Sequence, residues 1–112
     1  MANTFFNKLS RNIGTALTAV GGYTVASDSS TTVVVVGLSV SNTSATSVDV
    51  EVTLNDGAND FYLVKDAPVN AGSSLVVVGG DQKIVLESGH SIKVNSSASS
   101  SVDAIMSIME IT

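Results

Sequence analysis

Apolar and polar residues alternate along several segments of this chain, and the alternation is strictest over residues 47–54. Apolar residues occupy every second position there and polar residues fill the others: Val48, Val50, Val52 and Leu54 against Ser47, Asp49, Glu51 and Thr53. Successive side chains of a β-strand point to opposite faces. The pattern therefore predicts a half-buried strand with the three valines and Leu54 inward and Asp49 and Glu51 outward.

The segments on either side of this strand also favour β-structure. Residues 32–42 carry a run of β-branched valines followed by Leu38 and Val40, and they end in the polar sequence Asn42-Thr43-Ser44. β-Branched residues favour strands, and short polar residues favour turns. We expect residues 32–42 to pair with residues 47–54 as a hairpin, and Asn55-Asp56-Gly57 to form the next reversal.

Further short apolar segments follow, each bounded by glycine, proline or serine, at residues 60–65, 75–78, 83–86 and 91–95. The first is expected to end at Ala67-Pro68, because proline lacks the N–H group that a sheet needs. Turn signals recur about every ten residues, a spacing typical of sandwiches. The predicted fold is all-β, an antiparallel β-sandwich or small jelly roll of about eight strands.

The last segment, residues 102–112, differs because both of its faces are apolar. One face holds Val102, Ala104, Met106 and Ile108, and the other holds Ile105, Met109 and Ile111. A central strand buried on both sides is one explanation. The other is that a second chain covers one face.

The first residues form the least regular segment, and we divide the chain into an N-terminal arm, 1–12, and a sandwich domain, 13–112. A short helix would place Phe5 and Leu9 of the arm on one face, whereas residues 13–20 favour a strand leading to Tyr23. The arm either docks on a neighbouring subunit or closes one end of the sandwich. The candidate assembly contacts at the two ends are Phe5, Phe6, Leu9, Ile105, Met109 and Ile111.

Composition narrows the classes of function. The chain has 112 residues, 44% of them hydrophobic and only 13% charged, with a net charge of −5 and no cysteine. One hydrophobic core is expected at this length.

No basic stripe is present to neutralise phosphates, so nucleic-acid binding is not expected. No apolar run approaches the length of a membrane span or a signal peptide, so we expect no membrane partner and synthesis in the cytoplasm.

Chemistry-bearing residues are sparse, and we expect neither an enzyme nor a cofactor. His90 is the only histidine. It continues the alternation of Ile92 and Val94, which favours a core or rim position over a catalytic base or a metal ligand. Oxygen-bearing residues cluster around Gly57 and could hold calcium, but a hydrogen-bonded hairpin tip is the favoured explanation. These residues are Asn55, Asp56, Asn59 and Asp60.

Several motifs together resemble the small virion proteins of tailed bacteriophages. They are Val36-Gly37-Leu38-Ser39-Val40-Ser41-Asn42-Thr43-Ser44, Phe61-Tyr62-Leu63-Val64-Lys65-Asp66-Ala67-Pro68-Val69, Ala71-Gly72-Ser73-Ser74-Leu75, the turn and strand at residues 83–94, and Glu110-Ile111-Thr112. The resemblance begins near Ile13 and covers most of the chain. His90 stands where the family has aspartate after the turn glycine.

The resemblance implies a non-enzymatic β-sandwich located in the virion, as a capsid decoration protein, a neck component or a tail accessory protein. Its expected partners are copies of itself, in a closed ring such as a trimer, and another capsid, neck or tail protein. The alternative is a carbohydrate-binding module for host attachment. Such modules bind sugars through exposed aromatic residues, and only Tyr23, Phe61 and Tyr62 are available outside the arm.

Overall fold

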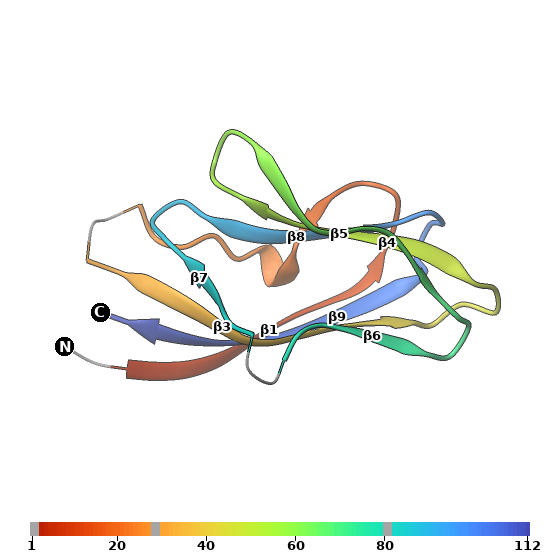
Figure 1. Ribbon diagram of the computed structural model, residues 1–112, viewed down its shortest axis with the longest axis horizontal. Helices are drawn as coiled ribbons and strands as arrows, with labels where there is room; N and C mark the ends of the chain where they lie inside the picture. The colour runs from red at the N-terminus through yellow and green to blue at the C-terminus, as the bar shows by residue number, and fades with distance from the viewer. Residues whose placement is uncertain (1–2, 28–29, 80–81) are drawn as a thin grey trace.

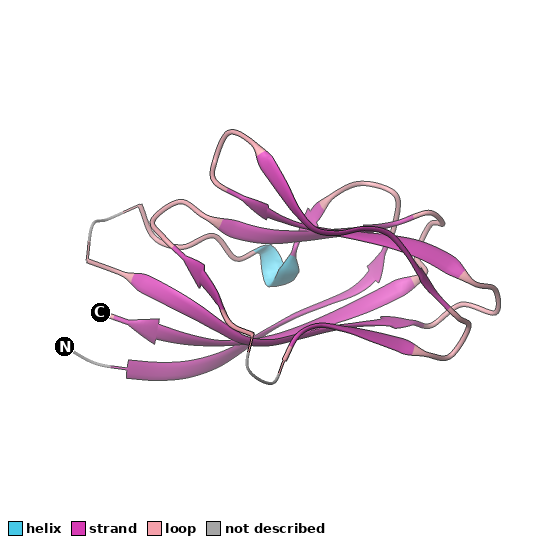
Figure 2. Ribbon diagram, viewed as in Figure 1, coloured by secondary structure: helices cyan, strands magenta, loops and turns pink. Residues whose placement is uncertain are grey.

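The computed structural model describes residues 3–27, 30–79 and 82–112. The regular structure of these residues is antiparallel β-sheet with one short 3₁₀ turn, η1, which lies between the two layers (Figure 2). The elements are β1 (Asn3–Ile13), β2 (Thr18–Ala19), η1 (Val20–Gly22), β3 (Thr32–Asn42), β4 (Val48–Asn55), β5 (Asp60–Val69), β6 (Ser74–Val78), β7 (Ile84–Leu86), β8 (Ser91–Ser96) and β9 (Val102–Ile111).

The strands form two sheets that stack face to face (Figure 1). The first sheet has the order β1-β9-β3-β6, with β7 also paired to β3, and the second has the order β2-β8-β4-β5. The strand pairs are nested along the chain: β1 with β9, β2 with β8, β3 with β6 and β7, and β4 with β5. A long antiparallel ribbon wound in this way into two sheets is a jelly roll. The predicted fold class is confirmed.

The predicted hairpin between residues 32–42 and 47–54 is wrong. These residues form β3 and β4, which belong to different sheets. The chain crosses between the layers through residues 43–47. Each strand pairs instead with strands far away in the sequence, β3 with β9 and β4 with β8. Two strands with apolar inward faces can pair side by side or stack across a core, and the alternation of side chains is the same in both cases.

Strand β5 runs past the proline that was expected to end it. Pro68 lies opposite Asp49 near the end of the β4–β5 pair. β5 is the edge strand of its sheet, so the missing N–H group of Pro68 interrupts no ladder on the outer side. The strand is irregular between Val64 and Ala67, where Asp66 has a positive φ of 52°. The turn predicted at residues 55–57 does join β4 to β5.

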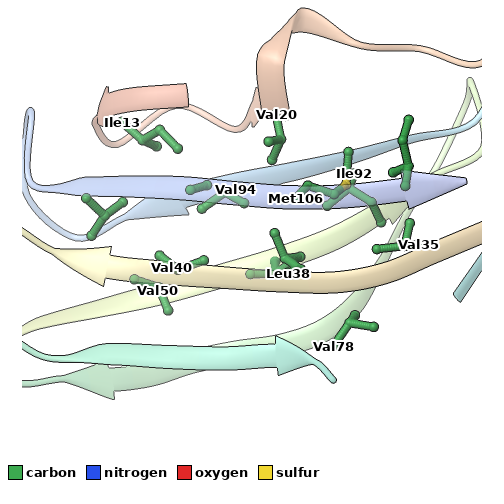
Figure 3. Packing of buried hydrophobic residues seen from close by; sticks show 14 of the residues in the cluster. Ile13, Val20, Val35, Leu38, Val40, Val50, Val78, Ile92, Val94 and Met106 are labelled. Carbon is green, nitrogen blue, oxygen red and sulfur yellow. The ribbon is translucent and has the colours of Figure 1, made fainter. Parts of the chain in front are cut away.

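The core lies between the sheets, and side chains from both layers meet there, including Leu38 and Val40 of β3 and Val50 of β4 (Figure 3). Val48, Val50 and Val52 are buried, Leu54 packs against the core, and Asp49 is exposed, as the alternation predicted. The other buried hydrophobic residues are Ile13, Val20, Val25, Val33, Val35, Leu38, Val40, Val69, Val78, Leu86, Ile92, Val94, Val102, Ala104, Met106 and Ile108.

The first residues that the structure describes form a strand and not a helix. Residues 3–13 make β1, which pairs with β9 along its length, while residues 1 and 2 of the expected arm lie outside the described residues. The strand expected over residues 13–20 is reduced to the two residues of β2, after which η1 begins. The described ends of the chain therefore lie side by side in one sheet (Figure 1).

Candidate assembly surface

The outer surface of the first sheet carries two rows of apolar side chains that cross its strands. The pairing of the strands aligns Phe5 with Met109, Val34 and Val85 in one row. It aligns Leu9 with Ile105, Ser39 and Val76 in the other row. A row of small or polar residues separates them, consisting of Asn7, Ser107 and Gly37. We call this surface the apolar face.

Large side chains of the apolar face are open to solvent. Phe5 is 70% exposed, Val76 66%, Leu9 57%, and Ile105 and Val85 52% each. Single exposed hydrophobic residues are ordinary, but soluble monomers rarely leave such residues adjacent across several strands of one sheet. The apolar face thus has the composition of a surface that another molecule covers.

Charged groups lie at the border of the apolar face and not within its rows. A shallow depression of about 450 Å³ lies at one end, lined by Leu9, Arg11, Asp103 and Ile105 among others. There the Asp103 carboxylate accepts a hydrogen bond of 3.0 Å from the Asn12 backbone N–H.

The outer surface of the second sheet has the opposite character. Asp49, Glu51 and Asp66 line a polar depression of about 180 Å³ together with Asn95, Ser96 and Ser97. Lys65 Nζ lies 3.3 Å from Glu51 Oε2, and this hydrogen bond raises the pKa of the lysine. The outer surface of the first sheet is therefore apolar, whereas this depression on the second sheet is polar and acidic.

The candidate contacts from the sequence divide between the two sides of the first sheet. Phe5, Leu9, Ile105 and Met109 lie in the rows of the apolar face, and Ile111 follows Met109 on the same side of β9. Phe6 lies on the opposite side of β1, across from the buried Ile108. The structure thus brings together five of the six proposed residues.

Phe6 belongs to a separate group on the inner side of β1. The Lys8 ammonium lies 5.4 Å from the centre of the Phe6 ring and 4.7 Å from that of Tyr23. The Tyr23 hydroxyl donates a 3.0 Å hydrogen bond to Glu110 Oε2. Partial burial, this hydrogen bond and the negative charge of Glu110 raise the pKa of Tyr23 to about 12. This group holds the chain around η1 against β1 and β9.

The sequence reasoning missed Val34, Val76 and Val85, which complete the apolar face on β3, β6 and β7. A signal was available, because residues 33–36, 75–78 and 84–86 are apolar at consecutive positions. A strand with such a sequence presents hydrophobic side chains on both faces, as β9 does. Only the register shows that these outward residues line up with Phe5 and Leu9.

His90 is half-buried, which agrees with the predicted rim position, but its predicted place on a strand is wrong. It lies in the turn before β8 and not on the strand with Ile92 and Val94. His90 Nδ1 accepts a hydrogen bond from the Glu87 backbone N–H at 3.2 Å, and the His90 N–H donates to the Glu87 carbonyl. Gly89 has a φ of 79°, which suits glycine at the third position of such a turn. The imidazole therefore serves to close the turn.

The oxygen-bearing residues around Gly57 act as acceptors within the hairpin. Asp56 Oδ1 accepts from the N–H groups of Ala58 and Asn59, which lowers the pKa of this carboxyl. Asp60 Oδ1 accepts from the Thr53 hydroxyl and the Asn55 amide. Among the described residues, no group of three or more histidine, cysteine or acidic side chains is arranged to hold a metal ion.

The three aromatic residues considered for sugar binding do not form one platform. Tyr23 is engaged by Lys8 and Glu110. Phe61 and Tyr62 are exposed but are consecutive residues of β5, so they project to opposite sides of it.

In the described part of the chain, no helix is long and apolar enough to cross a membrane.

Comparison with known proteins gives structural neighbours and no sequence relatives. No family model and no curated protein matches the chain. A subunit of the disulfide-linked pili of Bacillus endospore appendages has a similar fold, with a TM-score of 0.55 and 10% identity over 99% of this chain and 87% of that one. The capsid of Helicobacter pylori bacteriophage KHP30 is similar, with a TM-score of 0.56 and 9% identity over 100% of this chain and 89% of the other.

A third similar structure comes from the T13 IBDV viral particle, with a TM-score of 0.56 and 10% identity. The match covers 96% of this chain but only 30% of that one. Two of these neighbours are viral capsid proteins, one of them from a bacteriophage. At such low identity the similarity establishes the jelly-roll fold.

Proposed function

We propose that this protein is a non-enzymatic structural subunit of a virus particle, in which it packs in multiple copies. The observation that carries the proposal is the apolar face: exposed, uncharged along its rows, and spanning every strand of the first sheet. Contiguous exposed apolar surface of this kind marks sites where another molecule binds.

The neighbours support a role in assembly. The pilus subunit and the two capsid proteins are parts of structures built from repeated subunits, and they share this fold. The disulfide linkage of the pilus has no counterpart here, because the chain contains no cysteine. Its copies must be held by surface contacts, and many weak contacts add in a lattice.

The resemblance of the sequence motifs to small virion proteins of tailed phages supports a more specific proposal. The protein would be a capsid decoration protein or a neck or tail accessory protein, in contact with its own copies and with a larger capsid, neck or tail protein. Sugar binding is the weaker candidate, because Phe61 and Tyr62 project from opposite sides of β5.

The proposal is tested by locating the protein in particles. Virions purified on density gradients from the natural source are probed with an antibody against the chain, and the copy number is measured by mass spectrometry against the major coat protein. A fixed ratio of many copies per particle is expected. Absence of the chain from every particle fraction of a source that expresses it would refute the proposal.

A further inference from the structure

We infer that the apolar face binds the same face of a second copy of this chain, with a two-fold axis roughly parallel to the strands. The inference deepens the proposed function by naming the partner and the orientation of one assembly contact. It rests on the distribution of large and small side chains across the face, on its charge and on its area.

The apolar face is divided into a ridge and a shelf. The ridge lies on β1 and β9 and consists of Phe5, Leu9, Ile105 and Met109. The shelf lies on the neighbouring β3, β6 and β7 and consists of smaller residues, Val34, Gly37, Ser39, Val76 and Val85. Large side chains thus occupy one half of the sheet and small ones the other half.

A two-fold axis parallel to the strands makes this surface complementary to itself. It places the ridge of each copy over the shelf of the other, with Phe5 above the second copy's Val85 and Leu9 above its Val76. Each apolar row then faces the same row of the second copy. An axis perpendicular to the strands would instead set ridge against ridge and leave the shelves apart. The contact is isologous and closes with two copies.

The distribution of charge permits this contact. The chain carries a net charge of −5, so most surfaces of two copies repel each other. The rows of the apolar face contain no charged residue, and in the proposed orientation Asp103 and Arg11 lie over Ser41 and Ser74 of the second copy. The carboxylates of Asp49, Glu51 and Asp66 are on the opposite side of the sandwich.

The size of the face indicates a weak contact. Counted over residues 103–111 of β9, so that the flanking rows of Asp103 and Ile111 are included, four strands about 4.8 Å apart give a contact of roughly 15 by 27 Å, about 400 Å² for each copy. Two copies would bury about 800 Å², less than most stable complexes, so we expect a Kd of the order of 10 µM. Such a contact is reversible between free copies and contributes fully only within a particle.

The first test measures association in solution. Sedimentation equilibrium from about 5 to about 500 µM brackets the expected Kd, and the fitted mass should approach twice the 11.4 kDa of one chain. Phe5→Ser should weaken the dimer at least tenfold. The matched control is Phe61→Ser, which removes a phenylalanine of similar exposure, 55% against 70%, from the second sheet. A monomer throughout, a trimer, or equal effects of the two variants would overturn the inference.

The second test checks the orientation, using the absence of native cysteine. Leu9→Cys and Val76→Cys are made in separate chains, mixed and treated with a short bismaleimide cross-linker. The proposed contact predicts a cross-link between the two variants, because their Cα atoms would lie about 10 Å apart, the spacing of stacked sheets. A direct disulfide would need Cα atoms within about 7 Å. In a dimer of either variant alone, the two cysteines are displaced along the sheet by three strands, about 14 Å, in addition to the gap between the sheets. Each variant alone should cross-link much less than the mixture. Equal cross-linking in all three samples would contradict the ridge-on-shelf orientation.

The two proposals fail separately. A chain that is found in virions but stays monomeric and does not cross-link refutes the two-fold contact and leaves the structural role standing. A dimer with the predicted cross-link that is absent from particles refutes the role in the virion and leaves the contact standing.

Discussion

Asn42 connects three segments at one end of the sandwich, and replacing it with aspartate changes the chemistry with almost no change of shape. Asn42 is 2% exposed. Its Nδ2 donates to the carbonyls of Thr46 and Val69 at 2.8 and 2.9 Å, and its Oδ1 accepts from the backbone N–H and the hydroxyl of Ser44. The side chain thus ties the end of β3 to the crossing between the sheets and to the end of β5.

The Asn42→Asp variant retains the two acceptor contacts with Ser44 and loses both donor contacts. At neutral pH a carboxylate oxygen would face two carbonyl oxygens at less than about 3 Å, where none can donate. The Thr46 carbonyl keeps the Ser44 hydroxyl as a donor at 2.8 Å, and the Val69 carbonyl keeps the more distant Ser47 hydroxyl at 3.4 Å. The cost of the two lost hydrogen bonds is therefore about 0.5–1.5 kcal/mol each, roughly 1–3 kcal/mol together. Burial of the charge adds to this, and we expect a loss of at least about 3 kcal/mol, from a total that is usually about 5–15 kcal/mol.

The assay is urea unfolding followed by circular dichroism, at fixed protein concentration and at several pH values. The matched control is Asn70→Asp, which makes the same substitution at an exposed position in the next turn. Burial and the two carbonyls raise the pKa of the new carboxyl in the folded state, so the loss of stability should be greatest above that pKa. It should shrink as the pH falls, because a protonated carboxyl can donate one hydrogen bond. A cost within about 0.5 kcal/mol of the control at pH 7, or one that does not depend on pH, would refute this account.

Three further predictions test the core, one titrating group and the hairpin tip. Val50→Asp, at a fully buried position of β4, should cost several kcal/mol in urea unfolding, whereas Val76→Asp, at an exposed position, should cost far less. Tyr23 should titrate near pH 12 in absorbance at 295 nm in a Tyr62→Phe background, and Glu110→Gln should lower this value. Because the pKa is raised from 10.0 to about 12 on folding, the stability that the Tyr23 proton provides should be complete below pH 10 and be lost as the pH rises through 12. Calcium and chelators should leave the melting temperature unchanged, since Asp56 and Asp60 are engaged within the hairpin, and a rise of a few degrees with calcium would contradict this.

The pattern of side chains predicted the faces of the strands more reliably than their partners. The alternation over residues 47–54 predicts the buried side of β4, and the sequence of residues 102–111 shows that both sides of β9 are apolar. The pairing of β3 with β4 was wrong, because a period of two is the same whether a strand's neighbour lies beside it or across the core. The prediction that the strand ends at Pro68 was wrong for a related reason. An edge strand tolerates proline, and the sequence does not show that β5 lies at the edge of its sheet.

The sequence by itself determined that this chain is all-β, which residues of β4 and β9 face inward, and that its hydrophobic content exceeds what one core would hide. These properties are local, because they follow from the two-residue period of a strand and from the chemistry of turns. The tertiary structure decided what depends on distant pairing. The register between residues 3–13 and 102–111 aligns Phe5 and Leu9 with Met109 and Ile105, and the pairing of β3 adds Val76 and Val85. The tertiary structure also buries Asn42, which the sequence alone places in a polar turn. Only folding brings the Val69 carbonyl within hydrogen-bond distance of the Asn42 side-chain amide.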